Sequence, residues 1–562
     1  MNMIAPPAVL AGAADQSSSS VDQFIDGLFA PFAEWLSFIV FFEIPLFGVG
    51  LPLIVVWLMV GAIFLTVFLR FQPITGLKHS LRVIRGKFTR KTDPGEVSSF
   101  QALATELSGT VGLGNIAGVA VAITIGGPGA ALWIIIFGLL AMSMKMAEAT
   151  LGVKYRQITG DGKTSGGPMY YLREGLAEVG WPRLGKFLAV FYALTALIGV
   201  FGAGNLFQAN QVAAIIVDST GGDSSFLADK LWLIGLVMAL VAGFVIIGGI
   251  KKIAEWTSAI TPAMAILYTA CVLIILAMNI TNIPHAFWLM IEGAFTGEGV
   301  AGGIVGVAIV GIQRALFSNV GGVGTAGMAH AAVKTDEPAT EGFTAMWEPL
   351  VDSVIICTLT ALAIITTGLY QADAGDGSTG AGVALTSQAF ATVSAWFPYL
   401  LTVAVVLFGF STVLSYAYYG QKALGYLTKN SVVAEKIFQF VWVAAVVVGS
   451  AVSLDSVVAF SDATLFLMAV PNLLGLYFLS KIVRMEIIRH KTKVAVGTMS
   501  EVPADLQVGL RDHEPTPEQV EREKTRRHKA REHRKRVRSG FRSAQRKRGV
   551  DVDALDDPDR KI

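Results

Sequence analysis

The chain has 562 residues, of which 53% are hydrophobic and 15% are charged, and its formal net charge is +2. Its mean hydropathy of +0.59 and its shortage of charge exclude a soluble protein of this size, in which about a quarter of the residues are charged. The composition predicts an all-α polytopic membrane protein. The two cysteines, Cys271 and Cys357, have no CxxC spacing and indicate neither a disulfide framework nor a zinc site.

Apolar windows long enough to cross a bilayer core of about 30 Å follow one another along most of the chain. About eleven transmembrane helices are expected, near residues 45–70, 99–127, 130–155, 187–217, 231–249, 256–279, 301–332, 346–369, 383–418, 437–454 and 461–481. Residues 1–44 carry no lysine or arginine and are expected to form an external N-terminal segment. The first span and the basic loop after it make up residues 45–98.

Lysine and arginine in short loops set the orientation of the spans, because cytoplasmic loops are enriched in both. The loop after the first span holds Arg70, Lys78, Arg82, Arg85, Lys87, Arg90 and Lys91. The later inner loops are expected to hold Lys163, Arg173, Arg183, Lys186, Lys251, Lys252, Lys422 and Lys429, and the outer loops Asp218, Asp223, Asp229, Glu292, Glu298, Asp373 and Asp376. The alternation predicts a multi-pass protein of the cell membrane with an external N-terminus and a cytoplasmic C-terminus.

Beyond Lys481 the chain becomes polar and ends in a basic run, so residues 482–562 are expected to form a basic cytoplasmic tail. A disordered or partly helical tail that follows the positive-inside rule accounts for this composition. Binding of the tail to anionic membrane lipid is the alternative. Nucleic acid is not an expected partner, because the basic run has almost no aromatic residues.

The window at 99–127 contains GTVGLGNIAG, residues 109–118. Gly109, Gly112 and Gly114 weaken the helix where a membrane span should be most regular. In hydrocarbon, non-helical backbone is tolerated only where it is buried in protein or lines a cavity. A break would therefore aim freed amides and carbonyls at a bound carboxylate or a small cation. Close packing of small residues between helices is the alternative.

A second interruption, FSNVGGVGTAGMAHAA at residues 317–332, lies in the span that begins the second half of the chain. The orientation of the spans makes the first broken helix run outward and the second inward, as in an inverted repeat with a binding site at mid-membrane. The sequence therefore predicts two five-helix repeats, over 99–279 and 301–481, joined by an external connection over 280–300.

Several motifs also carry a family resemblance: GNIAGVA at 114–120, GGPGA at 126–130, KMAEA at 145–149, NLFQANQ at 205–211, FSN at 317–319 and LFGFSTVLSYAYYGQKALGYL at 407–427. With these motifs the chain resembles the alanine or glycine:cation symporter family over most of residues 45–481. The resemblance implies a leucine-transporter type fold, with a 5+5 inverted repeat after one extra N-terminal helix. It also implies sodium-coupled uptake of small neutral amino acids.

The resemblance implies the site residues as well. The expected sodium ligands are Ser108, Thr110, Val111, Asn115, Ser411 and Thr412. The expected substrate-binding residues are Thr110, Gly112, Gly114, Asn115, Gln208, Ser318, Asn319 and Tyr416. Two alternatives stay open: Ser411 and Thr412 can bond to the backbone of their own helix, and Gln208 can serve an interhelical hydrogen bond.

The chain departs from the family pattern at the second break, where SNVGGVGTAG stands in place of SNEAGMGSAP. Val320 replaces a glutamate and Gly327 replaces a proline, and Tyr416 stands where a tryptophan is usual. A lost carboxylate and a changed aromatic residue leave the choice of substrate and of coupling ion open.

Ionisable residues inside the spans are costly unless they are paired or face water. Lys145 and Glu148 stand at i and i+3 and are expected to pair on one helix face. Glu106, Arg314, Glu348 and Asp352 are isolated in sequence. Structural or gating ion pairs toward the cytoplasmic side are expected for Glu348 and Asp352, and a proton relay through Asp352 or Glu106 is the alternative.

Only His285 and His330 of the seven histidines lie near the membrane, and neither has a carboxylate or cysteine partner at ligand spacing. An enzyme is therefore not expected. The sequence predicts a secondary active symporter that imports alanine or glycine with sodium by alternating access and needs no cofactor besides that coupling ion. A proton-coupled transporter of another small amino acid and a transporter-derived membrane sensor are the alternatives. The oligomeric state is not predicted.

Overall fold

The computed structural model describes residues 20–46, 49–158, 164–247, 249–296, 302–371, 382–503 and 506–508, together with residues 521 and 525. The described residues are mainly helical, which confirms the predicted helical class. Their strands form two short hairpins, β1 (Glu43–Leu46) with β2 (Val49–Pro52) and β3 (Gln157–Ile158) with β4 (Thr164–Ser165). Most of the predicted tail, together with Lys163, Glu298, Asp373 and Asp376, lies outside the described residues.

Seven helices in the described part of the chain are long and apolar enough to cross a membrane. They are α7 (Gly129–Lys154), Pro182–Ser219, Lys252–Met278 of α12 (Gly249–Met278), Pro338–Thr367, α20 (Pro398–Thr428), α21 (Val432–Ala451) and α22 (Leu454–Ala495). Pro182–Ser219 joins α9 (Pro182–Phe201), η2 (Gly202–Leu206) and α10 (Phe207–Ser219), and Pro338–Thr367 joins α16 (Pro338–Ala345), α17 (Trp347–Pro349), η5 (Leu350–Cys357) and α18 (Thr358–Thr367).

Shorter helices complete the fold. The apolar ones are Phe29–Val40 of α1 (Ser20–Val40), α2 (Leu53–Phe68), α11 (Leu231–Ile246) and α14 (Gly303–Asn319). The others are α3 (Gln72–Thr75), α4 (Leu77–Ile84), α8 (Pro168–Glu178), η3 (Gly222–Ser224), η4 (Ile280–Asn282), α13 (Ile283–Thr296), α15 (Thr325–His330), η6 (Leu369–Gln371) and α19 (Gly382–Ala391). The count of eleven crossings stays a prediction.

Two predicted spans differ from the helices that form. The window at 45–70 begins in the β1–β2 hairpin, and its helix, α2, starts only after Pro52. The window at 383–418 is not one span but two helices, α19 and α20. Pro398 is the first residue of α20, where a proline fits because the first helical amide has no partner in the helix.

The first predicted interruption is confirmed. α5 (Ser99–Thr110) begins with a capping box, in which Gln101 N donates to Ser98 Oγ at 3.1 Å and Ser98 N donates to Gln101 Oε1 at 2.9 Å. After Thr110 the backbone leaves the helix, and η1 (Leu113–Asn115) and α6 (Ala117–Gly126) continue at an angle of 55°. Counted as one span, this bent pair is an eighth candidate crossing.

The second predicted interruption is also confirmed, between α14 and α15. Val320, Gly322 and Gly324 have φ angles of 45°, 90° and 97°. A β-branched residue rarely adopts this left-handed conformation, so Val320 is strained, and such strain is common at functional sites.

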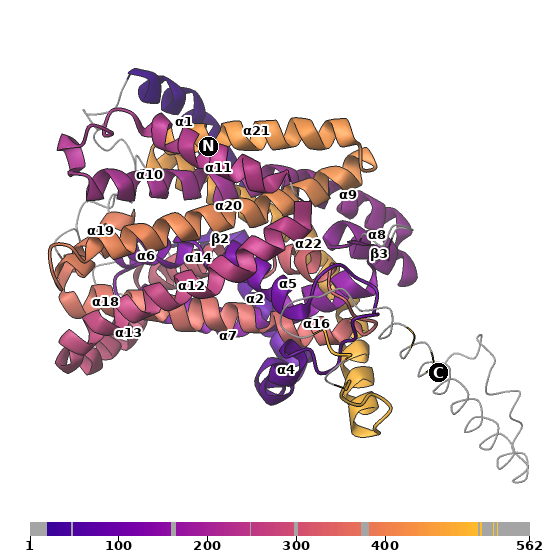
Figure 1. The fold of residues 1–562 in the computed structure, drawn as a ribbon. Coiled ribbons are helices and arrows are strands. Elements are labelled where there is room, and N and C mark those ends of the chain that lie inside the picture. Colours follow the sequence, from indigo (N-terminus) through magenta and orange to yellow (C-terminus); the bar gives the residue numbers. More distant parts are fainter. Residues whose placement is uncertain are drawn as a thin grey trace, which may run out of the picture.

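The helices pack so that both breaks lie next to α7. This helix contacts α14, α15, α16 and η5, while α12 and α20 lie side by side across the molecule (Figure 1).

Beyond the bundle, the end of α22 lies beside α4, where His79 Nε2 and His490 Nε2 are 2.8 Å apart. Arg82 forms an ion pair of 2.7 Å with Glu501, and its hydrogen bond lowers the pKa of that carboxyl group.

Substitution of Gly152 tests the contact between α7 and α15. A Cβ atom there would lie 2.3 Å from the carbonyl oxygen of Gly327, so Gly152→Ala is expected to destabilise the fold by about 1–3 kcal/mol through overpacking. Gly118 in α6 has nothing within 4 Å of the same atom, and Gly118→Ala is the matched control. Heat denaturation of the purified proteins measures the difference, and equal midpoints for both variants would contradict this packing.

Candidate functional site

The two breaks touch each other. A Cβ atom on Gly114, in the first break, would lie 3.1 Å from Phe317 Cδ1 and 3.4 Å from Ser318 Cα at the second. A larger residue at this position would press on the Phe317 ring. The predicted site residues Gly114 and Ser318 are therefore brought together.

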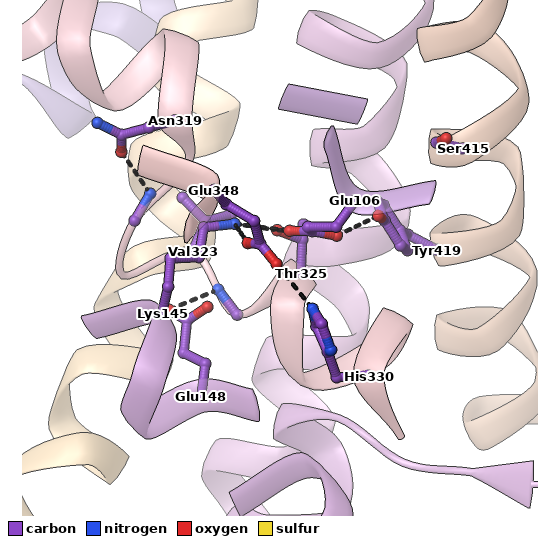
Figure 2. A network of polar contacts seen from close by, with 12 residues as sticks. Glu106, Lys145, Glu148, Asn319, Val323, Thr325, His330, Glu348, Ser415 and Tyr419 are labelled. Atoms are coloured by element: carbon purple, nitrogen blue, oxygen red, sulfur yellow. Dashed lines mark hydrogen bonds and ion pairs between the residues drawn. The ribbon is translucent and has the colours of Figure 1, made fainter. Parts of the chain in front are cut away.

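In each break an asparagine side chain accepts a hydrogen bond from a backbone amide. Asn115 Oδ1 accepts a hydrogen bond from Gly112 N at 3.0 Å, and Asn319 Oδ1 accepts one from Gly321 N at 2.8 Å (Figure 2). Both side chains are buried, so these bonds satisfy amides that the interrupted helices leave free. The Nδ2 groups then point to the helix that follows α17: Asn319 Nδ2 donates to Ser353 Oγ at 2.9 Å.

Asp352 joins the two breaks. Its Oδ1 accepts a hydrogen bond from Asn115 Nδ2 at 2.6 Å, and its Oδ2 accepts one from Ser318 Oγ at 2.5 Å and one from Ser353 Oγ at 2.9 Å. The side chain is fully buried, and within the described part of the chain it forms no ion pair. The expectation of an ion pair toward the cytoplasmic side is therefore not met for Asp352, which lies between the breaks instead.

The hydroxyl pair of α20 faces the first break. Thr412 Oγ1 donates to the carbonyl oxygen of Ser108 at 2.8 Å, and Ser108 Oγ donates to the carbonyl oxygen of Ser411 at 2.8 Å. Ser411 and Thr412 also lie 3.0 Å from the carbonyl oxygen of Phe408 in their own helix. Both hydroxyls therefore bond to the backbone of their own helix, the alternative that the sequence left open, and the sodium site stays a prediction.

Three further predicted residues line the first break. Gln208 Oε1 accepts a hydrogen bond from Leu113 N at 3.3 Å, so it binds the unwound segment itself. A Cβ atom on Gly112 would lie 2.7 Å from Thr412 Oγ1, so a larger residue here would displace the Thr412 side chain. Thr110 is 3% exposed, and its hydroxyl has no hydrogen-bond partner among the described residues. A buried hydroxyl without a partner is available to a ligand.

Tyr416 and Val111 lie at the edges of this arrangement. The Tyr416 ring is buried against Gly204 in η2, where a Cβ atom would lie 2.0 Å from ring Cγ. Tyr416 also contacts Tyr419, with ring centroids 5.5 Å apart. Val111 ends α5, and its amide still donates to Leu107 O at 2.6 Å.

Residues that the sequence analysis did not single out for the site hold the second break. Glu148 Oε1 accepts hydrogen bonds from Gly324 N at 3.1 Å and from Asn472 Nδ2 at 2.9 Å. Asn472 Nδ2 also donates to Gly322 O at 2.7 Å, and Tyr192 donates to Val323 O at 2.9 Å. The groups come from α7, α9 and α22, so no local spacing in the sequence marks them.

A buried charge network lies beside the breaks (Figure 2). Lys145 Nζ is 2.6 Å from Glu106 Oε1 and 3.2 Å from Glu348 Oε2, and all three side chains have no exposed surface. Glu106 also accepts hydrogen bonds from Thr325, at 2.6 Å, and from Tyr419. The predicted pairing of Lys145 with Glu148 is wrong, because Lys145 turns to α5 and α17 while Glu148 binds the second break. The predicted ion pair of Glu348 is present.

His330 extends this network. Its Nδ1 lies 2.7 Å from Glu341 Oε2 and its Nε2 lies 2.7 Å from Glu348 Oε1. The sequence analysis assigned His330 no carboxylate partner, because both glutamates are too far along the chain to form a recognisable spacing. The turn after α15 brings all three together.

Arg314 of α14, just before the second break, forms a buried ion pair with Asp462 of α22. The Arg314 guanidinium lies 5.3 Å from the Phe317 ring centroid, and Phe317 meets Phe207 edge-on with centroids 4.7 Å apart. Phe207 precedes Gln208 and Phe317 precedes Ser318, so this aromatic contact lies next to two of the predicted site residues.

This chain is similar to several known proteins. A family model described as the sodium:alanine symporter family matches residues 37–503. The chain is 38% identical over 433 residues to the sodium/alanine symporter AgcS of Methanococcus maripaludis, covering 77% of this chain and 92% of that protein. It is 32% identical over 434 residues to the probable sodium/glutamine symporter GlnT of Bacillus subtilis, covering 77% of this chain and 86% of that protein. A crystal structure of MhsT in complex with L-phenylalanine matches 70% of this chain and 99% of that chain, with a TM-score of 0.49 and 12% identity.

Removal of Lys145 tests the charge network. Lys145→Met would leave Glu106 and Glu348 buried without a cation, and breaking such a pair typically costs about 3–5 kcal/mol. The variant is expected to denature at a much lower temperature than the wild type. The triple variant Lys145→Met, Glu106→Gln and Glu348→Gln is expected to recover much of the loss, because no unpaired charge is left in that contact.

The matched control for this prediction is Lys154→Met. Lys154 pairs with Glu486 at 2.7 Å, but 24% of the lysine side chain is exposed. Its loss is expected to cost less than the loss of Lys145, because Arg489 Nη1 lies 3.9 Å from Glu486 Oε2 and remains to pair with that carboxylate. If Lys145→Met were as mild as this control, the buried network would not hold the helices together.

Proposed function

Because this chain belongs to the sodium:alanine symporter family, we propose that it imports a small neutral amino acid, alanine or glycine, coupled to sodium by alternating access. The family membership makes it a multi-pass membrane protein that transports an amino acid by symport. The proposal adds the substrate, the direction of transport and the residues that bind ion and substrate.

The observation that carries the proposal is the contact of Asp352 with both interrupted helices. A buried carboxylate without a cation partner is costly in an apolar interior. Asn115 and Ser318 compensate it in part by hydrogen bonds. A sodium ion, or the ammonium group of an amino acid, would supply the missing positive charge at the junction of the breaks.

The sodium site is proposed at Ser108, Thr110, Val111, Asn115, Ser411 and Thr412. Sodium is a hard cation that prefers oxygen ligands, and these residues offer carbonyl, hydroxyl and amide oxygen atoms. The contact of Thr412 Oγ1 with the Ser108 carbonyl, at 2.8 Å, supports this assignment, because two oxygens that would share one ion already face each other.

The substrate is proposed to lie against Thr110, Gly112, Gly114, Asn115, Gln208, Ser318, Asn319 and Tyr416. The hydroxyl of Thr110, which has no hydrogen-bond partner among the described residues, is available to the substrate, and the close neighbours of Gly112 and Gly114 favour a substrate with a small side chain. Half-helix amino ends at both breaks favour the carboxylate of an amino acid. No covalent chemistry is required.

The arrangement proposed for the chain is a leucine-transporter type fold with repeats over residues 99–279 and 301–481, after one extra helix. The N-terminus is proposed to be external and the C-terminus cytoplasmic. Ion and substrate that bind one state better than the other shift the equilibrium between outward-open and inward-open forms. Reciprocal stabilisation of the two sites couples sodium to the amino acid.

Uptake of labelled alanine into proteoliposomes tests the proposal. An inward sodium gradient is expected to drive uptake by the wild type. Asp352→Asn keeps the shape of the side chain but removes its charge, and Asn115→Ala removes the link between the breaks. Both variants are expected to lower sodium-driven uptake by about tenfold or more, within the usual range of coupling between sites.

The control is Asp229→Asn, which removes an exposed carboxylate that pairs with Lys230 at 2.8 Å outside the site. Its uptake is expected to match the wild type. Wild-type uptake that is the same with and without the sodium gradient would refute sodium coupling. Full activity of Asp352→Asn would refute the role assigned to the carboxylate between the breaks.

A further inference from the structure

His330 lies between two carboxylates at the end of α15. Nδ1 is 2.7 Å from Glu341 Oε2, and Nε2 is 2.7 Å from Glu348 Oε1. None of the three side chains has exposed surface, so water cannot take the place of either contact. Figure 2 shows His330 pointing at Glu348 on the side of the network that faces away from Asn319.

The two contacts of His330 with Glu341 and Glu348, called the bridge below, determine how many protons these three side chains hold. A neutral imidazole has one N–H group and one lone pair, and an ionised carboxylate only accepts. Two short contacts to two carboxylates therefore need one additional proton, either on the imidazole or on a glutamate. Without it, a nitrogen lone pair would face a carboxylate oxygen in a buried position, which is strongly unfavourable.

We infer that His330, Glu341 and Glu348 form a proton-binding site that holds α5, the first half of the first broken helix, against α16 and α17, an arrangement called the closed form below. The consequence for transport rests on the proposed function, whereas the proton site itself does not. The ligand is a single proton, and the site is separate from the residues proposed to bind sodium.

Both carboxylates of the bridge are also linked to α5, Glu341 directly and Glu348 through Lys145. Glu341 Oε1 accepts a hydrogen bond from Ser99 Oγ at 2.7 Å, at the first residue of that helix. Glu348 Oε2 lies 3.2 Å from Lys145, which pairs with Glu106 of the same helix. A change at the bridge therefore reaches α5 at its start and near its middle.

The surroundings of the bridge favour a bound proton. The charged and titratable groups that belong to the contact network of the bridge are Lys145 and Glu148 of α7, Glu106 of α5, Tyr419 of α20, Glu341 of α16 and Glu348 of α17. Arg156 donates to the carbonyl oxygens of Ala331 and Val333, at 2.8 and 2.5 Å, just after His330. Four carboxylates against one lysine and this arginine leave an excess of negative charge, which one proton reduces.

The direction in which stability changes with pH follows from the form that binds the proton. The closed arrangement binds the proton, so acidic pH keeps the bridge intact. As the pH rises the proton leaves, one of the two contacts becomes repulsive, and α5 is held less firmly. Stability of the closed form should therefore fall with rising pH, and opening of this arrangement should become easier.

The test is heat denaturation of the full chain in detergent between about pH 6 and pH 9, the range around histidine titration. The variants are His330→Gln, which removes the imidazole, and Glu341→Gln, whose amide lets a neutral imidazole satisfy both contacts. His285→Gln is the control, because His285 is exposed on α13. The midpoint of the wild type and of the control is expected to fall with rising pH, and both bridge variants are expected to lose at least half of that fall.

Sodium-driven alanine uptake by the same proteins, at the same pH on both sides of the vesicle, separates the two proposals. Wild-type uptake is expected to rise with pH several-fold more than that of either bridge variant. Unchanged pH dependence of denaturation in Glu341→Gln and His330→Gln would overturn the proton site. Flattened denaturation profiles without any alanine uptake by the wild type would support the proton site and overturn the proposed function.

Discussion

The ammonium group of Lys145 imposes the constraint on which the packing around the two broken helices depends. A lysine with no exposed side chain needs carboxylates within contact distance, because the apolar interior offers no water to stabilise its charge. Glu106 of α5 and Glu348 of α17 meet that need at 2.6 and 3.2 Å. The position of the first broken helix relative to α7 and to the helix after the second break is therefore set by charge as well as by packing.

The same rule, applied to backbone groups, explains the shape of the candidate site. Interrupted helices leave amides and carbonyls without partners, and each must be satisfied by protein in the absence of water. Asn115, Asn319 and Glu148 take three of the amides, at 2.8–3.1 Å. Because these amides are already satisfied, the places where an ion or an amino acid can add a contact are the hydroxyl of Thr110 and the carboxyl group of Asp352, which has hydrogen-bond partners but no cation partner among the described residues.

Two different kinds of contact lie near the breaks. Five buried ionisable residues, Glu106, Lys145, His330, Glu341 and Glu348, form one connected network. The ion pair of Arg314 with Asp462 and the aromatic contact between Phe207 and Phe317 form a second group of contacts. A network of hydrogen-bonded charges responds to the gain or loss of one proton, whereas an aromatic contact does not, so pH sensitivity is expected at His330.

The sequence by itself determined the membrane character, the helical class, both helix breaks and the family, because apolar windows, glycine runs and motif letters are local properties of the chain. It did not determine which helices the charges join. Glu148, three residues from Lys145, was the nearest partner in sequence, yet Glu106 and Glu348 take that place, and His330 finds glutamates 11 and 18 residues away. Such pairings depend on how far each helix is rotated about its axis when it packs, and the central position of Asp352 depends on it too. Only the tertiary structure fixes that rotation, since it results from all the helices packing at once.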